Sequence, residues 1–117
     1  MKKINDWLEK FTTFWKTQNI DGVLGLFTDG VEYWETPFIR VPNFTDLRRE
    51  WENIKNQQNI IINCKVFSKE NNKYSVFWDL EYTDTANHPK HYKGTYLIRL
   101  NSDNKCDYFF HCGESKT

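Results

Sequence analysis

Residues 19–38, NIDGVLGLFTDGVEYWETPF, hold the change of pattern that decides the fold. In the first part Asn19 is in position to cap a short helix, and apolar residues recur on one side of that helix. Asp29-Gly30 then predicts a turn, and VEYWETPF (31–38) has the β-branched and aromatic residues of a strand. A helix therefore leads through a turn into a strand. The apolar residues of the helix are Val23, Leu24 and Phe27.

Glu35 lies inside this predicted strand. Side chains alternate along a strand, so Val31, Tyr33 and Glu35 share one face. A carboxylate in line with a valine and a tyrosine either meets water at the strand end, before Pro37, or points into a pocket. In a pocket walled by rings it would lose hydration, and its pKa would rise towards the range useful for proton transfer at neutral pH. The sequence leaves both alternatives open.

On either side of this stretch, apolar residues recur at three- and four-residue steps, which predicts helices. The first helix runs from Ile4 to Trp15, and FIRVP (38–42) predicts a brief return strand. Asn43 and Asp46 resemble a capping box for a third helix that reaches Lys55. Its apolar side holds Phe44, Leu47, Trp51 and Ile54, and its solvent side holds Arg48, Arg49, Glu50, Glu52 and Lys55.

From residue 59 the apolar period changes to two, which is typical of strands. Strands are predicted over 59–67, 73–83, 91–100 and 106–112, separated by polar turns that include a hairpin loop at 84–90. Consecutive strands with short connections pair antiparallel, and helices gathered early in the chain cover one face of the sheet. The fold class is therefore α+β. One face of the strand at 73–83 carries Tyr74, Val76, Trp78, Leu80 and Tyr82.

The length, charge, hydropathy and cysteine content of the chain argue against several classes of protein. The 117 residues predict one domain spanning 1–117. The 16 basic and 16 acidic residues balance without a run of either sign, which argues against a dedicated nucleic-acid binder. No apolar stretch approaches the roughly 20 residues of a bilayer span, and Asp6 and Glu9 precede any region that a secretory signal would need. Three cysteines without a CxxC motif favour a reducing cytoplasm. We expect a cytoplasmic protein that binds neither nucleic acid nor membrane.

The aromatic content is unusual, with 5 Trp, 6 Tyr and 9 Phe. It predicts either a core of a few large residues or a cavity lined by rings whose polar tips orient a ligand. His88 and His91, in HPKH, have metal-like spacing but lie in a predicted loop with no third ligand. The sequence also has no glycine-rich phosphate loop. We expect a small-molecule ligand, no cofactor and no metal.

The order of elements resembles the nuclear transport factor 2-like superfamily, which includes ketosteroid isomerases and SnoaL-type polyketide cyclases. The resemblance rests on three sequence segments: residues 19–38, NFTDLRREW (43–51) and KGTYLIRLNSDNKCDYFF (93–110). The likeness runs from about residue 4 to 114. It implies three N-terminal helices packed on a strongly curved antiparallel sheet, a cone of the cystatin-like roll type with an internal cavity. Residues of the concave face would line that cavity, and the convex face would form a dimer.

The resemblance also implies roles for single residues. Glu35 falls where the steroid isomerases place their aspartate base. Their helix-one tyrosine donor corresponds to Phe11, which has no hydroxyl, and their second donor corresponds to Tyr96, which can still donate. The paired arrangement is lost, so we do not expect a steroid isomerase. His111 shares a strand face with Phe109 and titrates near neutrality, which makes it a third candidate catalytic residue beside Glu35 and Tyr96.

Six aromatic residues are candidates for ligand contact, and the superfamily resemblance places Trp51 and Phe109 at the cavity. The alternative for each ring is ordinary core packing. For Tyr96 the alternative is a core tyrosine bonded to a backbone carbonyl, and for His111 it is a histidine on a fraying final strand. The candidate ligand-binding residues are Phe11, Trp15, Tyr33, Trp51, Trp78 and Phe109.

Asp79 and Glu81 look like a catalytic pair of carboxylates, but alternation places them opposite Trp78, on the convex face. Basic residues that could pair with them there are Lys65, Lys93 and Arg99. Apolar residues on the same face are Phe77, Leu97, Tyr108 and Phe110. This mixed surface favours a homodimer interface over a catalytic site.

Three functions fit the pattern. The first is a pocket protein that binds a small apolar or aromatic metabolite and, as an isomerase, cyclase or hydrolase, uses Glu35 as the base in a cofactor-free proton transfer. Tyr96 or His111 would then stabilise the developing charge. The second is a non-catalytic binder with the same cavity. The third is a dimerising interaction module that works through the convex face.

Overall fold

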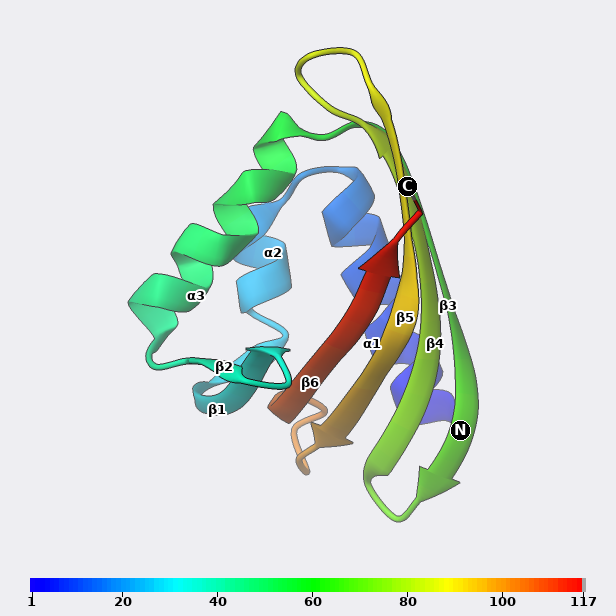
Figure 1. Ribbon diagram of the computed structural model, residues 1–117. Coiled ribbons are helices and arrows are strands. Elements are labelled where there is room, and N and C mark those ends of the chain that lie inside the picture. Colours follow the sequence, from blue (N-terminus) through cyan, green and yellow to red (C-terminus); the bar gives the residue numbers. More distant parts are fainter. Residues whose placement is uncertain (117) are drawn as a thin grey trace.

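The structure is a computed structural model that describes residues 1–116. Its helices are α1 (Lys2–Lys16), α2 (Ile20–Leu24), α3 (Phe44–Trp51) and the 3-10 helix η1 (Glu52–Asn56). Its strands are β1 (Phe27–Thr36), β2 (Ile39–Val41), β3 (Gln58–Glu70), β4 (Lys73–Thr83), β5 (Pro89–Leu100) and β6 (Cys106–Ser115). The helices lie together inside the bend of a curved sheet (Figure 1), which confirms the predicted α+β class.

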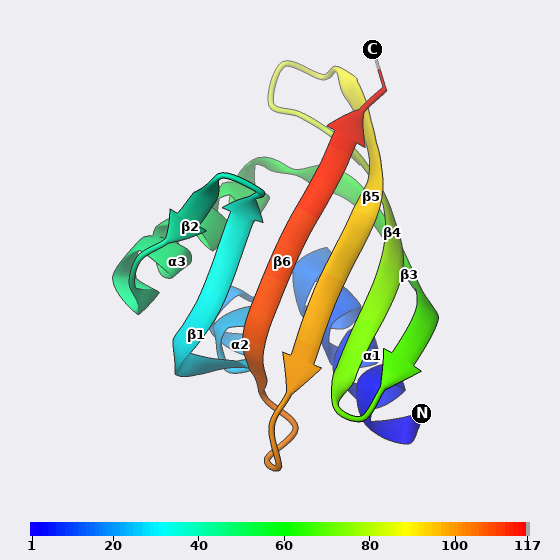
Figure 2. The same cartoon turned by 60° about the horizontal axis from the view of Figure 1, so that its bottom comes forward.

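The sheet has the strand order β2-β1-β6-β5-β4-β3, which can be followed from one edge to the other in Figure 2. Its hairpin-connected strands are antiparallel, as predicted. The pair β1–β6 is parallel instead, with Tyr33 opposite Phe109. Most of the chain separates these two strands, so no short turn forces them to run in opposite directions. This pairing brings the strand that carries Glu35 next to the strand that carries His111.

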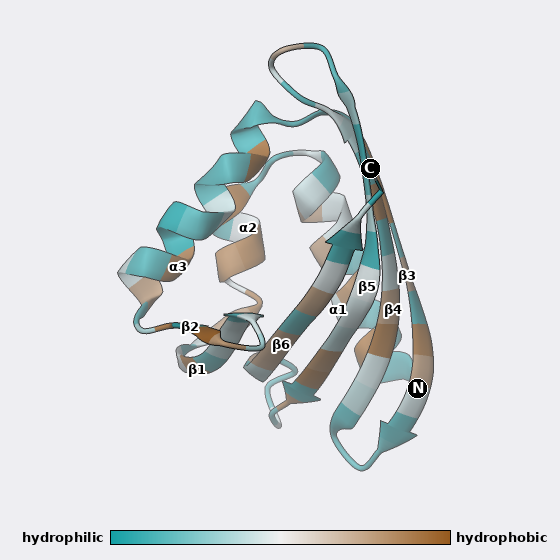
Figure 3. Cartoon of the chain, viewed as in Figure 1, coloured by the Kyte–Doolittle hydropathy of each residue, from teal (hydrophilic) through white to brown (hydrophobic). Residues whose placement is uncertain are grey.

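The helices are fixed by their apolar sides and their caps. The Asn19 side chain accepts from the Gly22 N–H at 2.9 Å, and the Asn43 side chain accepts from the Asp46 N–H at 2.8 Å, which confirms both predicted caps. The Trp7 Nε1–H donates to the Leu26 carbonyl at 3.1 Å and ties α1 to the start of β1. Figure 3 shows the matching pattern, with hydrophilic residues on the outer side of α3 and alternation along the strands. The buried side of α1 holds Ile4, Trp7, Leu8, Phe11 and Trp15.

Several predicted boundaries are wrong. β1 begins at Phe27, so Phe27 belongs to the strand and the turn expected at Asp29-Gly30 lies within it. The β1–β6 pairing is irregular between Phe27 and Glu32, and this irregularity absorbs the turn-like residues. β5 begins at Pro89, because the first residue of a strand can lack an N–H. The third helix changes to a 3-10 helix after Trp51.

Three further findings concern compartment and partners. In the described part of the chain, no helix combines the length and apolar character that a membrane crossing requires. Cys64, Cys106 and Cys112 are all free thiols. On the convex face Lys93 pairs with Asp79 at 3.4 Å, whereas Arg99 pairs with Asp107 at 2.7 Å rather than with Asp79 or Glu81 as expected.

Candidate functional site

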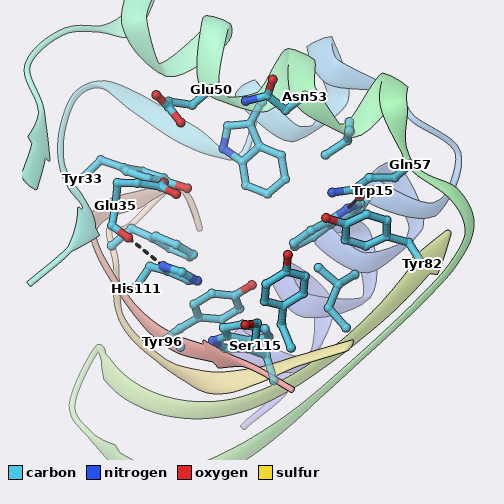
Figure 4. Close-up of a pocket in the computed structure, with 17 residues that line it drawn as sticks. Trp15, Tyr33, Glu35, Glu50, Asn53, Gln57, Tyr82, Tyr96, His111 and Ser115 are labelled. Carbon is cyan, nitrogen blue, oxygen red and sulfur yellow. Dashed lines mark hydrogen bonds between the residues drawn. The ribbon is translucent and has the colours of Figure 1, made fainter. Parts of the chain in front are cut away.

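A cavity of about 390 Å³ lies between the concave face of the sheet and the helices (Figure 4). Elements from both ends of the sequence line it. The sheet contributes Tyr33, Glu35, Trp78, Leu80, Tyr82, Tyr92, Tyr96, Phe109, His111, Gly113 and Ser115. The helices and the segment after η1 contribute Trp15, Glu50, Trp51, Asn53, Ile54 and Gln57. All three predicted catalytic residues therefore lie at one cavity, together with five of the six predicted ligand-binding residues.

Glu35 reaches the cavity from an irregular position in β1. Trp34 pairs with Arg40, but Thr36 pairs with Ile39, so Glu35 is an extra residue on the β1 side of the β1–β2 ladder. A β-bulge of this kind twists the strand locally and re-aims a side chain. The residues before it keep the expected alternation, since Glu32 accepts a hydrogen bond from the indole of Trp34 on the other face, at 2.9 Å.

The pKa of the Glu35 carboxyl is raised from 4.5 to about 7. The largest cause is desolvation by burial, and the charge of Glu50 adds to it. Figure 4 shows Glu50 on α3, near the same end of the cavity as Glu35. A carboxyl group with this pKa is present in both protonation states at neutral pH, so it can accept a proton and return it.

His111 is held by the backbone of the bulge. Its Nδ1 lies 2.7 Å from the Glu35 carbonyl oxygen (Figure 4). A carbonyl can only accept, so Nδ1 must carry the proton. Burial lowers the pKa of His111, although the same hydrogen bond opposes this shift. The ring is therefore neutral at pH 7, and its Nε2 is an unprotonated acceptor.

Tyr96 and Tyr33 contribute buried phenols. Burial raises the pKa of both well above 10.0, and the Glu35 charge adds to each shift, so both hydroxyls stay protonated. The Tyr96 ring stacks on Trp78 with centroids 5.5 Å apart, and the ring of Tyr33 stacks on Phe109 at 4.9 Å. Figure 4 shows the Tyr96 hydroxyl pointing into the cavity. No hydrogen bond to this hydroxyl is found among residues 1–116, so the alternative of a core tyrosine bonded to a backbone carbonyl is not supported.

The wall opposite the sheet is built from tryptophans. Trp15 meets Trp51 edge-on with centroids 5.0 Å apart, and its Nε1–H donates to the Gln57 side chain at 2.8 Å. The indole N–H of Trp78 is buried and has no partner in the described part of the chain. The indole N–H of Trp51 makes no hydrogen bond of good geometry there, although it lies near enough to the Tyr33 hydroxyl to oppose the rise of the Tyr33 pKa. Unpaired buried donors are uncommon and cost free energy. The Trp78 donor is therefore unused at the wall of the cavity.

Two glycines let Trp78 lie across the sheet. Trp78 is opposite Gly94 on β5, and Gly94 is opposite Gly113 on β6. A Cβ atom on Gly94 would come within 2.7 Å of the Trp78 ring, and one on Gly113 would come equally close to Trp78 Cη2. The row Trp78–Gly94–Gly113 thus provides the flat floor on which His111 also stacks, with its ring centroid 5.2 Å from that of Trp78.

The prediction that Phe11 contacts a ligand is not supported by its position. Phe11 is fully buried and does not line the cavity. Its ring stacks on Trp7 at 5.0 Å and meets Tyr96 edge-on at 5.8 Å, so it supports the wall from behind. Position 11 lies one turn before Trp15, and the rings of Trp51 and Phe109 also pack against it, with centroids 5.4 and 6.1 Å away.

Sequence reasoning missed several lining residues. Glu50 was expected on the solvent side of the third helix; it is exposed there but lines the cavity mouth. Asn53 and Gln57 lie on or just after η1, whose tighter turn no helix period predicts. Tyr82 and Tyr92 stack at the rim with centroids 6.0 Å apart. Tyr82 lies on the inward face already predicted for the strand at 73–83, and alternation could have found Tyr92, because Tyr92 shares a face with Tyr96.

A possible metal cluster lies on the convex face, outside the cavity. Ligand atoms of Asp79, Glu81 and His91 lie within 4.8 Å of one another. Asp79 already accepts from His91 at 2.7 Å and pairs with Lys93 at 3.4 Å. The Asp79 carboxylate is therefore already paired within the convex face. His88 does not join this cluster. Its side-chain Nδ1 lies 3.9 Å from Asp84 Oδ2 instead.

No protein-family model matches the sequence, and no curated protein is similar to it at a significant level. Solved structures share its fold. An NTF2-like protein from Exiguobacterium sp. 255-15 has 16% identity and a TM-score of 0.77, over 92% of this chain and 98% of that one. A Δ5-3-ketosteroid isomerase from Mycobacterium sp. has 13% identity and a TM-score of 0.80, over 97% and 98%. A Mycobacterium tuberculosis protein in complex with estradiol-17β-hemisuccinate has 12% identity and a TM-score of 0.78, over 92% and 91%. The chain has the fold of the nuclear transport factor 2-like superfamily.

Proposed function

We propose that this protein binds a small, largely apolar or aromatic molecule in the cavity and that Glu35 transfers a proton to and from it without a cofactor. The observation that carries the proposal is Glu35 itself, a half-buried carboxyl group at an aromatic-walled cavity with a pKa of about 7. One structure of the same fold was solved with estradiol-17β-hemisuccinate, which supports a small-molecule ligand.

In this proposal the ionised Glu35 takes a proton from a C–H or O–H group of the ligand, and the ligand keeps the electron pair. The Tyr96 hydroxyl, protonated and aimed into the cavity, donates a hydrogen bond to the negative charge that develops. His111 keeps Nδ1 on the Glu35 carbonyl and offers Nε2 as an acceptor for a ligand hydroxyl. Glu35 then returns its proton to another carbon of the ligand, which completes an isomerisation. Alternatively, the C–O bond to a ligand oxygen breaks as the double bond forms, and this oxygen takes the proton and leaves as water or an alcohol, which completes an elimination.

The test is a ¹³C NMR titration of the Glu35 side-chain carboxyl, assigned with the Glu35→Gln variant. We expect a midpoint near 7, as burial and Glu50 require. A midpoint at the ordinary value near 4.5 would remove proton transfer and leave the non-catalytic binder. Protein purified from its host and crystallised unaltered should then show the ligand as density beside Glu35.

A second candidate is a homodimer formed through the convex face. Phe67 and Phe77 are 71% and 48% exposed there, and their ring centroids lie 5.1 Å apart. Ile61 and Leu97 extend this convex patch across β3, β4 and β5. Clustered exposed rings of this kind mark interaction surfaces. The three free thiols support a reducing compartment, such as the cytoplasm, as the setting for either function.

A further inference from the structure

The charges at the cavity all have one sign. Glu35 and Glu50 are its acidic lining residues, and among residues 1–116 neither a lysine nor an arginine lines it. His111 adds no positive charge, because burial lowers its pKa and its ring is neutral at pH 7. Any ligand in this space therefore meets a negative potential that no protein cation offsets.

The rings of the cavity wall add to this potential. Eight of its lining residues are Trp, Tyr or Phe. The face of an aromatic ring carries partial negative charge and attracts cations, and tryptophan does so most strongly. Trp15 and Trp51 stand at 85° to each other, so the edge of one ring meets the face of the other, and both indoles line the cavity. Aromatic walls together with a carboxylate form the usual recognition site for ammonium groups.

We infer that the natural ligand of this cavity carries a positive charge, as a protonated or quaternary amine on an apolar or aromatic frame. This inference rests on the proposed function, because it names the ligand class of the same cavity. An anion would meet Glu35 and Glu50 and be repelled by both. A neutral ligand would leave the half-buried Glu35 without a counter-charge. A cation would balance the negative charge of Glu35 and so keep its carboxyl group in the ionised form that a general base needs.

The experiment compares four probes at pH 7.5 that share one phenyl ring and differ in the charge of the attached group. They are benzylamine, benzyltrimethylammonium, benzyl alcohol and benzoate. Binding is followed by NMR through the indole N–H signals of Trp51 and Trp78, which lie at the cavity wall. We expect both cations to bind at least about tenfold tighter than benzyl alcohol, from cation–π contacts and the Glu35 charge together. Benzoate should bind more weakly than the alcohol. The quaternary probe separates charge from hydrogen bonding, since it has no N–H.

Two variants test whether the charge of Glu35 causes the preference for cationic probes. Glu35→Gln should reduce the preference for cations over benzyl alcohol several-fold. Glu81→Gln, which removes the same charge from the convex face, should leave this preference unchanged. If benzyl alcohol binds the wild-type protein as tightly as the two cations, the charge inference is wrong and the cavity remains a binding site for neutral ligands. If no probe moves the Trp51 and Trp78 signals, both this inference and the proposed cavity binding fail.

Discussion

Glu35 combines a local backbone irregularity with an unusual environment. Its side chain lies at the cavity together with that of Tyr33, as alternation predicts, and its carbonyl, at the bulge, accepts from His111 Nδ1 at 2.7 Å. A folded-state pKa of about 7 lies above the ordinary 4.5. The group therefore favours folding below pH 4.5, and this contribution is lost as pH rises through 7. His111 acts in the opposite sense, since its lowered pKa favours folding above its ordinary value.

The first prediction concerns stability. Glu35→Gln should leave the free energy of unfolding unchanged at pH 4.5 and raise it by about 1–2 kcal/mol at pH 8, after allowance for solvent screening of a partly exposed group. Urea unfolding at the two pH values measures this, and the difference between variant and wild type removes the His111 contribution. Glu9→Gln, an exposed site on α1, is the matched control and should show no such slope. A variant less stable than wild type at pH 8 would contradict the burial of an ionised Glu35.

The second prediction separates the two causes of the Glu35 pKa. Glu50→Gln should lower the pKa of Glu35 by about 0.2–0.7, because exposed charges couple by about 0.2–1 kcal/mol. The larger cause, burial, stays in place, so the pKa should remain well above 4.5. ¹³C NMR titration of the Glu35 carboxyl reads this directly. Glu52→Gln removes an equally exposed charge two residues further on and should leave the Glu35 pKa where it is; equal effects from both variants would show a general rather than a specific charge effect.

At the scale of elements, periodicity predicts most of the fold. The helix over 4–15, both asparagine caps and the inward face of β4 are present as expected. What periodicity cannot give is pairing over a long sequence separation. The β1–β6 pair is parallel, and it sets where Tyr33 and Phe109 meet. The bulge at Glu35 is also hidden, because β1 ends at Thr36, one residue later, and no further alternation remains in which a shift of phase would be seen.

The third prediction belongs to the floor of the cavity. Gly113→Ala should destabilise the protein by about 1–3 kcal/mol, since its Cβ would lie 2.7 Å from Cη2 of a ring held by close packing. The displaced Trp78 should also change its indole NMR signal. Gly30→Ala on β1 is the control: nothing lies within 4 Å of its Cβ and its φ is not positive, so it should be neutral. Equal stability of the two variants would show that Trp78 does not need this floor.

At the scale of the whole molecule, the cavity exists only because distant elements converge. α1, β1, α3, β4, β5 and β6 all contribute a lining residue. Alternation and the superfamily resemblance could therefore nominate Glu35, Tyr96 and His111, but not their contacts with one another. The depth of a residue along the cone axis is equally hidden. Phe11 and Trp15 lie on the same side of α1, yet only Trp15 reaches the open part of the cavity.

The last prediction concerns the convex patch. If Phe67 and Phe77 form a dimer interface, light scattering at micromolar concentration should give twice the chain mass of 14.2 kDa. The double variant Phe67→Lys, Phe77→Lys places two charges in the patch and should give the monomer mass, with circular dichroism unchanged because both side chains are exposed. Phe38→Lys is the matched control, since Phe38 is 95% exposed in the turn between β1 and β2, outside the patch. A monomer mass for the wild type would contradict dimerisation, and a dimer that survives the double variant would place the interface on another face.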